Sequence, residues 1–161
     1  MGKKIWCAKV NVDGELKDVS EIYVGENGRV VRKYKRKVEL VEDGVDGGEL
    51  DYSSNIKREY IDEALRLTYG GAFDEFAGGW IITLPQYYKE ISIELKTTGN
   101  ASLTFMNSFG ETDSVTVRTN GYEIHSFIFA GVQKRKLSCS FGRGNTDPGE
   151  IYIKNLYGLR G

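Results

Sequence analysis

Aromatic and hydrogen-bonding side chains of the kind that bind saccharides are concentrated in three glycine-containing loops. Residues 70–79 hold two phenylalanines and two acids between glycine pairs, and residues 107–111 and 143–147 supply further aromatic, amide, acidic and guanidinium groups. Saccharide sites place flat rings against the apolar face of a sugar, while polar groups bond its hydroxyls. We therefore expect saccharide binding wherever the fold brings these loops together. The candidate ligand-binding residues are Phe73, Asp74, Phe76, Trp80, Asn107, Arg143 and Asn145.

No spacing in the chain marks a catalytic set. His125 is the only histidine, and in the alternating run 122–129 it shares a face with Phe127. A hydrolytic triad needs a base beside a nucleophile and a third group that orients the base. Asp74 and Glu75 offer the two acids that a glycosidase needs, but adjacent carboxylates in a short loop are more often solvated. We predict a protein that is not an enzyme.

No metal or cofactor is predicted. Residues 43–51 offer carboxylate oxygens of the kind that calcium prefers, but they lack the spacing of an EF-hand loop and are typical of an acidic linker. Cys7 and Cys139 fit no metal-binding motif, so we expect two buried, reduced thiols.

Charge and hydropathy argue against two classes of partner. The chain has 22 basic and 23 acidic residues and a net charge of −1, so no overall field attracts nucleic acid or an anionic membrane. The basic run 32–37 contains one aromatic residue, Tyr34, and is typical of a solvated strand edge. No apolar run approaches the roughly 20 residues that span a bilayer, and the first residues lack the apolar region of a secretory signal. We expect neither nucleic acid nor membrane as a partner.

Short alternating segments separated by turn residues predict the elements that must position these side chains. Strands with turn signals about every ten residues are typical of an antiparallel β-sandwich or barrel. Residues 54–63 are open between helix and strand. Trp80 opens an apolar strand, and its neighbours favour a core position over an exposed platform. The expected strands are 64–69, 80–84, 90–97, 101–106, 114–118, 122–129, 136–141 and 150–156.

Two similar units occupy the first forty residues, each an apolar strand, a turn dipeptide and a second strand. The dipeptides Asp13-Gly14 and Asn27-Gly28 tolerate the positive φ angles of a type I′ hairpin turn. Because one hairpin is only marginally stable, we expect this segment to pack on a partner and to serve in attachment. The sequence thus predicts a hairpin module at 1–40, an acidic glycine-rich linker at 41–53 and a β-sandwich domain, a jelly roll, at 54–161.

The tandem units resemble those at the start of tail and other virion structural proteins of phages that infect Firmicutes and related bacteria. The resemblance covers about residues 3–37 and rests on an apolar and aromatic start, the Asn-Gly or Asp-Gly turn and a following Lys-x-Val. It implies a non-enzymatic virion protein, assembled in the bacterial host cytoplasm with other virion proteins and as a homo-oligomer.

The later strand succession resembles jelly-roll carbohydrate-binding modules and related galactose-binding-like domains. It rests on the runs 64–67, 79–84, 88–93 and 150–157. The resemblance implies a domain that packs on the particle or binds host-surface saccharide, and a free-standing bacterial carbohydrate-binding module is the alternative. That family often has an acidic residue near a structural calcium in its closing strand; a lysine and an asparagine stand there in this chain, so no calcium is carried over.

Overall fold

A computed structural model describes the chain in nine stretches. The regular elements within them are all β-strands, paired antiparallel, so the prediction of an all-β antiparallel sandwich is confirmed. These stretches contain no helix with the length and apolar character needed to cross a membrane. The described residues are 9–13, 15–19, 21–53, 55–71, 78–84, 88–107, 115–128, 135–142 and 147–160.

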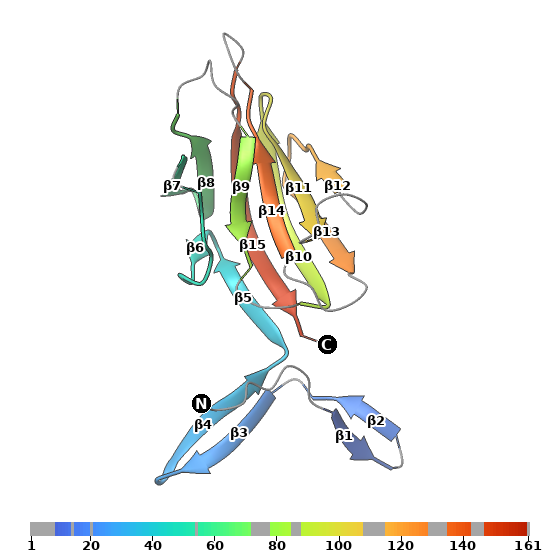
Figure 1. The fold of residues 1–161 in the computed structure, drawn as a ribbon. Coiled ribbons are helices and arrows are strands. Elements are labelled where there is room, and N and C mark those ends of the chain that lie inside the picture. The colour runs from blue at the N-terminus through green and yellow to red at the C-terminus, as the bar shows by residue number, and fades with distance from the viewer. Residues whose placement is uncertain are drawn as a thin grey trace.

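Two hairpins come first, and each forms a two-stranded sheet of its own. β1 (Lys9–Val12) pairs with β2 (Glu15–Asp18), and β3 (Glu21–Glu26) pairs with β4 (Arg29–Lys35). The second turn has φ angles of 50° at Asn27 and 74° at Gly28, as a type I′ turn requires. Figure 1 shows both hairpins beyond one end of the sandwich, with β4 leading directly into β5.

The larger sheet consists of β5 (Lys37–Glu42), β6 (Val45–Asp46), β7 (Ile56–Ile61), β8 (Ala64–Tyr69), β10 (Glu90–Thr98), β13 (Glu123–Ile128) and β15 (Glu150–Leu159). β15 is its centre. One side of β15 pairs with β10, which in turn pairs with β13. The other side pairs with β8 along the first part of β15 and with β5 along the last part. The hairpins β7–β8 and β5–β6 therefore lie end to end along one strand.

The smaller sheet consists of β9 (Gly78–Thr83), β11 (Ser102–Asn107), β12 (Val115–Val117) and β14 (Arg135–Ser140), in the order β12-β11-β14-β9. It packs on one face of the larger sheet (Figure 1). The two sheets share an apolar core, because alternate side chains of each strand turn inward. Its buried members include Ile91, Ile93, Leu95, Ile151 and Ile153 from the larger sheet, and Leu103, Phe105, Leu137 and Cys139 from the smaller one.

Residues 56–61, for which the sequence leaves a helix open, form the strand β7. A two-residue turn at Asp62 and Glu63, with φ angles of 50° and 57°, joins β7 to β8. The predicted strand 64–69 is confirmed.

The stretch 41–53, for which the sequence predicts a linker, contributes to the sandwich. Val41 and Leu50 are buried in the core, and β6 folds back on β5. Gly44 turns this hairpin with a φ of 78°, and its amide donates to the Lys154 carbonyl at 2.8 Å. Val41 and Leu50 therefore anchor this stretch to the sandwich.

Candidate functional site

The structure describes only some of the ligand-binding residues predicted from sequence. Phe73, Asp74, Phe76, Arg143 and Asn145 lie outside the described residues. For Trp80 and Asn107 the strand backbone is described, but not the side chain. Their meeting in one site therefore stays a prediction.

The strand register nevertheless fixes where these loops begin and end. Gly78, which follows one loop, pairs with Ser140, which precedes another, so both loops attach at the same end of the smaller sheet. Asn107 pairs with Arg135 at the opposite end of β14. The register thus brings together the attachment points of two predicted loops and separates them from the third.

A different surface combines described aromatic and polar side chains: the outer face of the larger sheet, which points away from the core. On β10 the residues Ile91, Ile93 and Leu95 are fully buried, so the intervening residues Glu94 and Lys96 point outward. We call this surface the outer face.

A bulge in β15 brings two tyrosines onto the outer face. Tyr152 pairs with Lys96 and Tyr157 pairs with Ser92, two positions of β10 that face outward. Tyrosines five residues apart in a regular strand would lie on opposite faces. The register shift opposite Glu94 and Leu95 supplies the extra residue that reverses the alternation.

A shallow groove of about 250 Å³ crosses the outer face from β13 to β5. Its polar groups are held by one another. Asn155 Nδ2 donates to Glu94 Oε2 at 2.7 Å, while Asn155 Oδ1 accepts from the Asp43 amide at 3.0 Å. At the β5 end, the Lys37 ammonium lies 4.2 Å from the centre of the Tyr157 ring. The groove is lined by Lys37, Glu39, Val41, Glu42, Ser92, Glu94, Ile124, Asn155 and Tyr157.

A second group of rings lies further along the same face. The Lys96 ammonium is 4.5 Å from the centre of the Tyr152 ring and 5.0 Å from that of Tyr122, so one cation joins two tyrosines. The Tyr152 hydroxyl donates to Glu150, and this bond, followed by burial, raises the pKa of Tyr152 to about 12. Burial, followed by the nearby Glu94 carboxylate, raises the pKa of Tyr122. Both hydroxyls therefore remain protonated donors at neutral pH.

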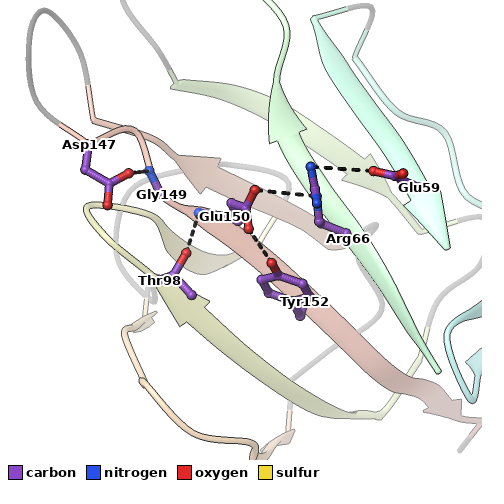
Figure 2. Close-up of polar contacts among 7 residues, drawn as sticks. All are labelled: Glu59, Arg66, Thr98, Asp147, Gly149, Glu150 and Tyr152. Carbon is purple, nitrogen blue, oxygen red and sulfur yellow. Dashed lines mark hydrogen bonds and ion pairs between the residues drawn. The ribbon is translucent and has the colours of Figure 1, made fainter. Parts of the chain in front are cut away.

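Charged neighbours hold Tyr152 in place, as Figure 2 shows. Glu150 pairs with the Arg66 guanidinium at 3.5 Å, and Arg66 pairs with Glu59 at 3.5 Å. The Glu150 amide donates to Thr98 Oγ1 at 3.0 Å, which fixes the start of β15 against the end of β10 (Figure 2). This network spans β7, β8, β10 and β15.

The arrangement suits binding through rings and hydrogen bonds. Tyrosine rings offer flat apolar faces, and beside them the ammonium groups donate, the carboxylates accept, and the side-chain amide does both. His125, the residue considered for catalysis, lies on β13 with Nε2 3.2 Å from Glu123 Oε2, and its alternation with Phe127 on the core side agrees with the sequence pattern.

The outer face is not among the sites predicted from sequence, because the predicted residues come mainly from loops and the side chains of the outer face lie mainly on strands. The signal that pointed there is the polar half of the alternating run 90–98, together with the tyrosines of the last strand. The bulge that aligns those tyrosines has no sequence signal of its own.

No protein-family model and no curated protein sequence matches the chain. Solved family 29 carbohydrate-binding modules are similar in fold. CBM29_1 from Piromyces equi is 18% identical, with a TM-score of 0.51 over 78% of this chain and 90% of that chain. A substituted CBM29-2 complexed with mannohexaose and another complexed with cellulohexaose are each 14% identical, with TM-scores of 0.55 and 0.52 over 78% of this chain and 92% and 91% of theirs. At these identities the likeness shows the fold alone.

Proposed function

We propose that this protein is a non-catalytic carbohydrate-binding β-sandwich that binds an oligosaccharide on the outer face of its larger sheet. The observation that carries the proposal is the groove from β13 to β5, which holds the Tyr157 ring beside ordered amide, carboxylate and ammonium groups. The fold shared with family 29 modules, two of which are complexed with hexasaccharides, supports the choice of ligand class.

Two tyrosine positions on the outer face favour an extended ligand over a single sugar. Tyr152 and Tyr157 lie opposite Lys96 and Ser92, which are four residues apart on β10, and this corresponds to roughly 13 Å at about 3.3 Å per residue. Each ring stacks on an ammonium group before any ligand arrives, so the side chains lose little freedom on binding. Asn155 and Glu94 lie between the rings and present hydrogen-bonding groups to the hydroxyls of the sugar chain.

Calorimetric titration with mannohexaose and with cellohexaose tests this proposal. For a hexasaccharide that binds, Tyr157→Ala is expected to weaken affinity about tenfold, equivalent to about 1.4 kcal/mol. Tyr23→Ala is the matched control, because Tyr23 is an exposed tyrosine of the separate hairpin β3–β4. No binding of either saccharide, or equal losses in both variants, contradicts the proposal. Release of reducing ends during the titration contradicts its non-catalytic part.

The N-terminal hairpins favour a second role in attachment. They expose large apolar side chains on two small sheets, and such surfaces commonly mark protein contacts. We propose that these side chains bind further copies of this chain or other virion proteins, in a virion assembled in the cytoplasm of a bacterial host. The exposed side chains are Val10, Val12, Tyr23, Val24 and Val30.

Light scattering of the full-length chain tests the attachment role. Val30, the most exposed of the five, is the position to change, and Val30→Lys is expected to reduce the mass of a homo-oligomer to that of the monomer. Val115→Lys, at an exposed valine of β12, is the matched control. A wild-type chain that is monomeric at high concentration, or an oligomer that withstands Val30→Lys, contradicts self-association through the hairpins.

A further inference from the structure

A second cleft lies where the hairpins β5–β6 and β7–β8 meet along β15. It has a volume of about 330 Å³ and is lined mainly by Gly44, Val45, Asp46, Arg58, Tyr60 and Leu65. We call it the edge cleft. Its volume falls within the range of small-molecule sites, roughly 300–1,000 Å³.

The edge cleft lies at an edge of the larger sheet and is separate from the groove of the outer face, with which it shares no lining residue. Tyr60 pairs with Leu65, which is buried in the core, and Asp46 pairs with Val41, which is also buried. Paired residues point to the same face of a sheet. Tyr60 and Asp46 therefore point to the core side. The strands that carry them, β7 and β6, lie at an edge of the larger sheet (Figure 1).

The apolar part of the edge cleft consists of an exposed tyrosine ring and an exposed valine above a buried leucine. Tyr60 is 58% exposed and Val45 is 61% exposed, whereas Leu65 at the floor is 5% exposed. Gly44 packs so closely that an added Cβ would lie 2.5 Å from the backbone of Ala64. The Tyr60 ring is therefore accessible above a closely packed floor.

The polar part of the edge cleft is ordered in the absence of ligand. Arg58 pairs with Asp46 at 3.6 Å, and its guanidinium lies 4.4 Å from the centre of the Tyr52 ring. Asp46 accepts hydrogen bonds from the Tyr52 hydroxyl at 2.7 Å and from the Gly48 amide at 2.8 Å. The Arg58 side chain is still 51% exposed, so its N–H groups are available to a ligand.

The charges at the edge cleft favour a neutral ligand rich in hydroxyls. An anion would meet the Asp46 and Glu59 carboxylates, and a cation would meet Arg58. A guanidinium and a carboxylate side by side can respectively donate to and accept from neighbouring hydroxyls. An exposed tyrosine ring next to them suits the apolar face of a sugar ring.

We propose that the edge cleft is a second saccharide-binding site, which takes one or two neutral sugar units of a separate chain. The Tyr60 ring stacks on the sugar, and Arg58 and Asp46 bond its hydroxyls. The ligand class rests on the proposed function, but the site does not, because it shares no residue with the groove of the outer face. Two separate sites on one sheet allow the protein to hold two saccharide chains at once, which raises its avidity for a polysaccharide surface.

Amide chemical shifts of the full-length protein, followed during titration with mannohexaose or cellohexaose, test this inference. We expect two sets of shifts, one at Gly44, Val45 and Tyr60 and the other at Asn155 and Tyr157. Tyr60→Ala is expected to weaken binding at the edge cleft about tenfold and to leave the shifts at Asn155 and Tyr157 unchanged. Tyr157→Ala is expected to weaken binding at the groove about tenfold and to leave the shifts at the edge cleft unchanged. Tyr60→Phe keeps the ring and is expected to bind like the wild-type protein.

The outcomes separate this inference from the proposed function. Shifts at the groove alone, or edge-cleft shifts that disappear with Tyr157→Ala, overturn the second site and leave the outer face intact. Shifts at the edge cleft alone overturn the outer face and retain the second site. Absence of shifts with both saccharides overturns both. Because Tyr60 is exposed, its replacement by alanine is expected to leave the fold intact, which the unchanged remainder of the spectrum verifies.

Discussion

At the residue scale, the ring of Tyr88 packs directly against the backbone of Gly158. A Cβ added to Gly158 would lie 2.3 Å from the Tyr88 ring, which is itself buried. We expect Gly158→Ala to lower the free energy of unfolding by about 1–3 kcal/mol, because the ring or the strand β15 must shift. Urea denaturation measures this loss. Gly25→Ala is the matched control, since a Cβ at Gly25 meets nothing within 4 Å; an equal effect in both variants would contradict the steric explanation.

Burial of Tyr88 also makes stability depend on alkaline pH. Burial, followed by the nearby Glu49 carboxylate, raises the pKa of Tyr88 from 10.0 to about 12. The folded state thus holds this proton more tightly than the unfolded chain does. The resulting contribution, on the order of 2 kcal/mol, is fully present below pH 10 and is lost as the pH rises through 12.

The variant Tyr88→Phe isolates this effect. We expect the free energy of unfolding, measured by urea denaturation at a series of alkaline pH values, to fall less steeply in Tyr88→Phe than in the wild-type protein. Some decline will remain, because the pKa values of Tyr52 and Tyr152 are also raised. Identical slopes would show that Tyr88 does not titrate differently in the folded and unfolded states.

At the scale of elements, the turn between β7 and β8 has a conformation that a substitution can relax. The turn between β7 and β8 places Asp62 and Glu63 at φ angles of 50° and 57°, without the glycine that such turns favour. A residue with a side chain pays about 1–2 kcal/mol in this conformation, whereas glycine loses about 0.5–1 kcal/mol through its greater freedom when unfolded. We therefore expect Glu63→Gly to raise the free energy of unfolding by about 0.5 kcal/mol.

Thermal denaturation of Glu63→Gly, with Lys57→Gly as the contrasting variant, tests this prediction. Lys57 lies inside β7, where glycine weakens a strand. The first variant is expected to melt a few degrees higher than the wild-type protein and the second a few degrees lower. A lower melting temperature for Glu63→Gly would mean that its side chain makes a stabilising interaction that outweighs the turn conformation.

Local signals explain which elements could be predicted from sequence. Asn27-Gly28 fixes a turn within two residues, and the alternation of Ile91, Ile93 and Leu95 marks a buried strand face, so both features were predicted and are observed. The sequence does not decide between helix and strand for β7, because its turn lacks glycine and its apolar residues fit both.

The candidate site could not be predicted in the same way, because it depends on pairing between distant strands. Tyr152 and Tyr157 share a face only because of a bulge, which is set by the register of β15 against β10. The edge cleft needs Asp46 and Arg58 from two hairpins that meet only along β15. The loop residues named from sequence stay predictions, since their side chains lie outside the described part of the structure.

At the scale of the whole molecule, the proposed saccharide sites and the proposed attachment surface lie on different parts of the chain. Both proposed saccharide sites lie on the sandwich, and their polar groups are ordered by strands that share β15. Among the strands that the structure describes, those of the hairpins β1–β2 and β3–β4 pair only with each other within each hairpin. A protein with this organisation could bind a partner through these hairpins without disturbing the sheet that carries the proposed saccharide sites.

This organisation predicts unequal stability along the chain. Two-stranded hairpins are marginally stable alone, so amides of β3 are expected to exchange with solvent through local opening, while those of β10 and β15 exchange only on global unfolding. Native-state hydrogen exchange measures both free energies. Gly28→Val, which forces a β-branched residue to a φ of 74°, is expected to abolish protection in β3 and leave β10 unchanged.

Gly25→Val is the matched control for this measurement, because the added side chain meets nothing within 4 Å and the strand conformation suits valine. Protection in β3 is expected to survive it. If Gly28→Val instead lowered protection in β10, or if β3 and β10 exchanged with one free energy in the wild-type protein, the hairpins and the sandwich would form one cooperative unit. The predicted boundary near residue 40 would then separate two functions but not two folding units.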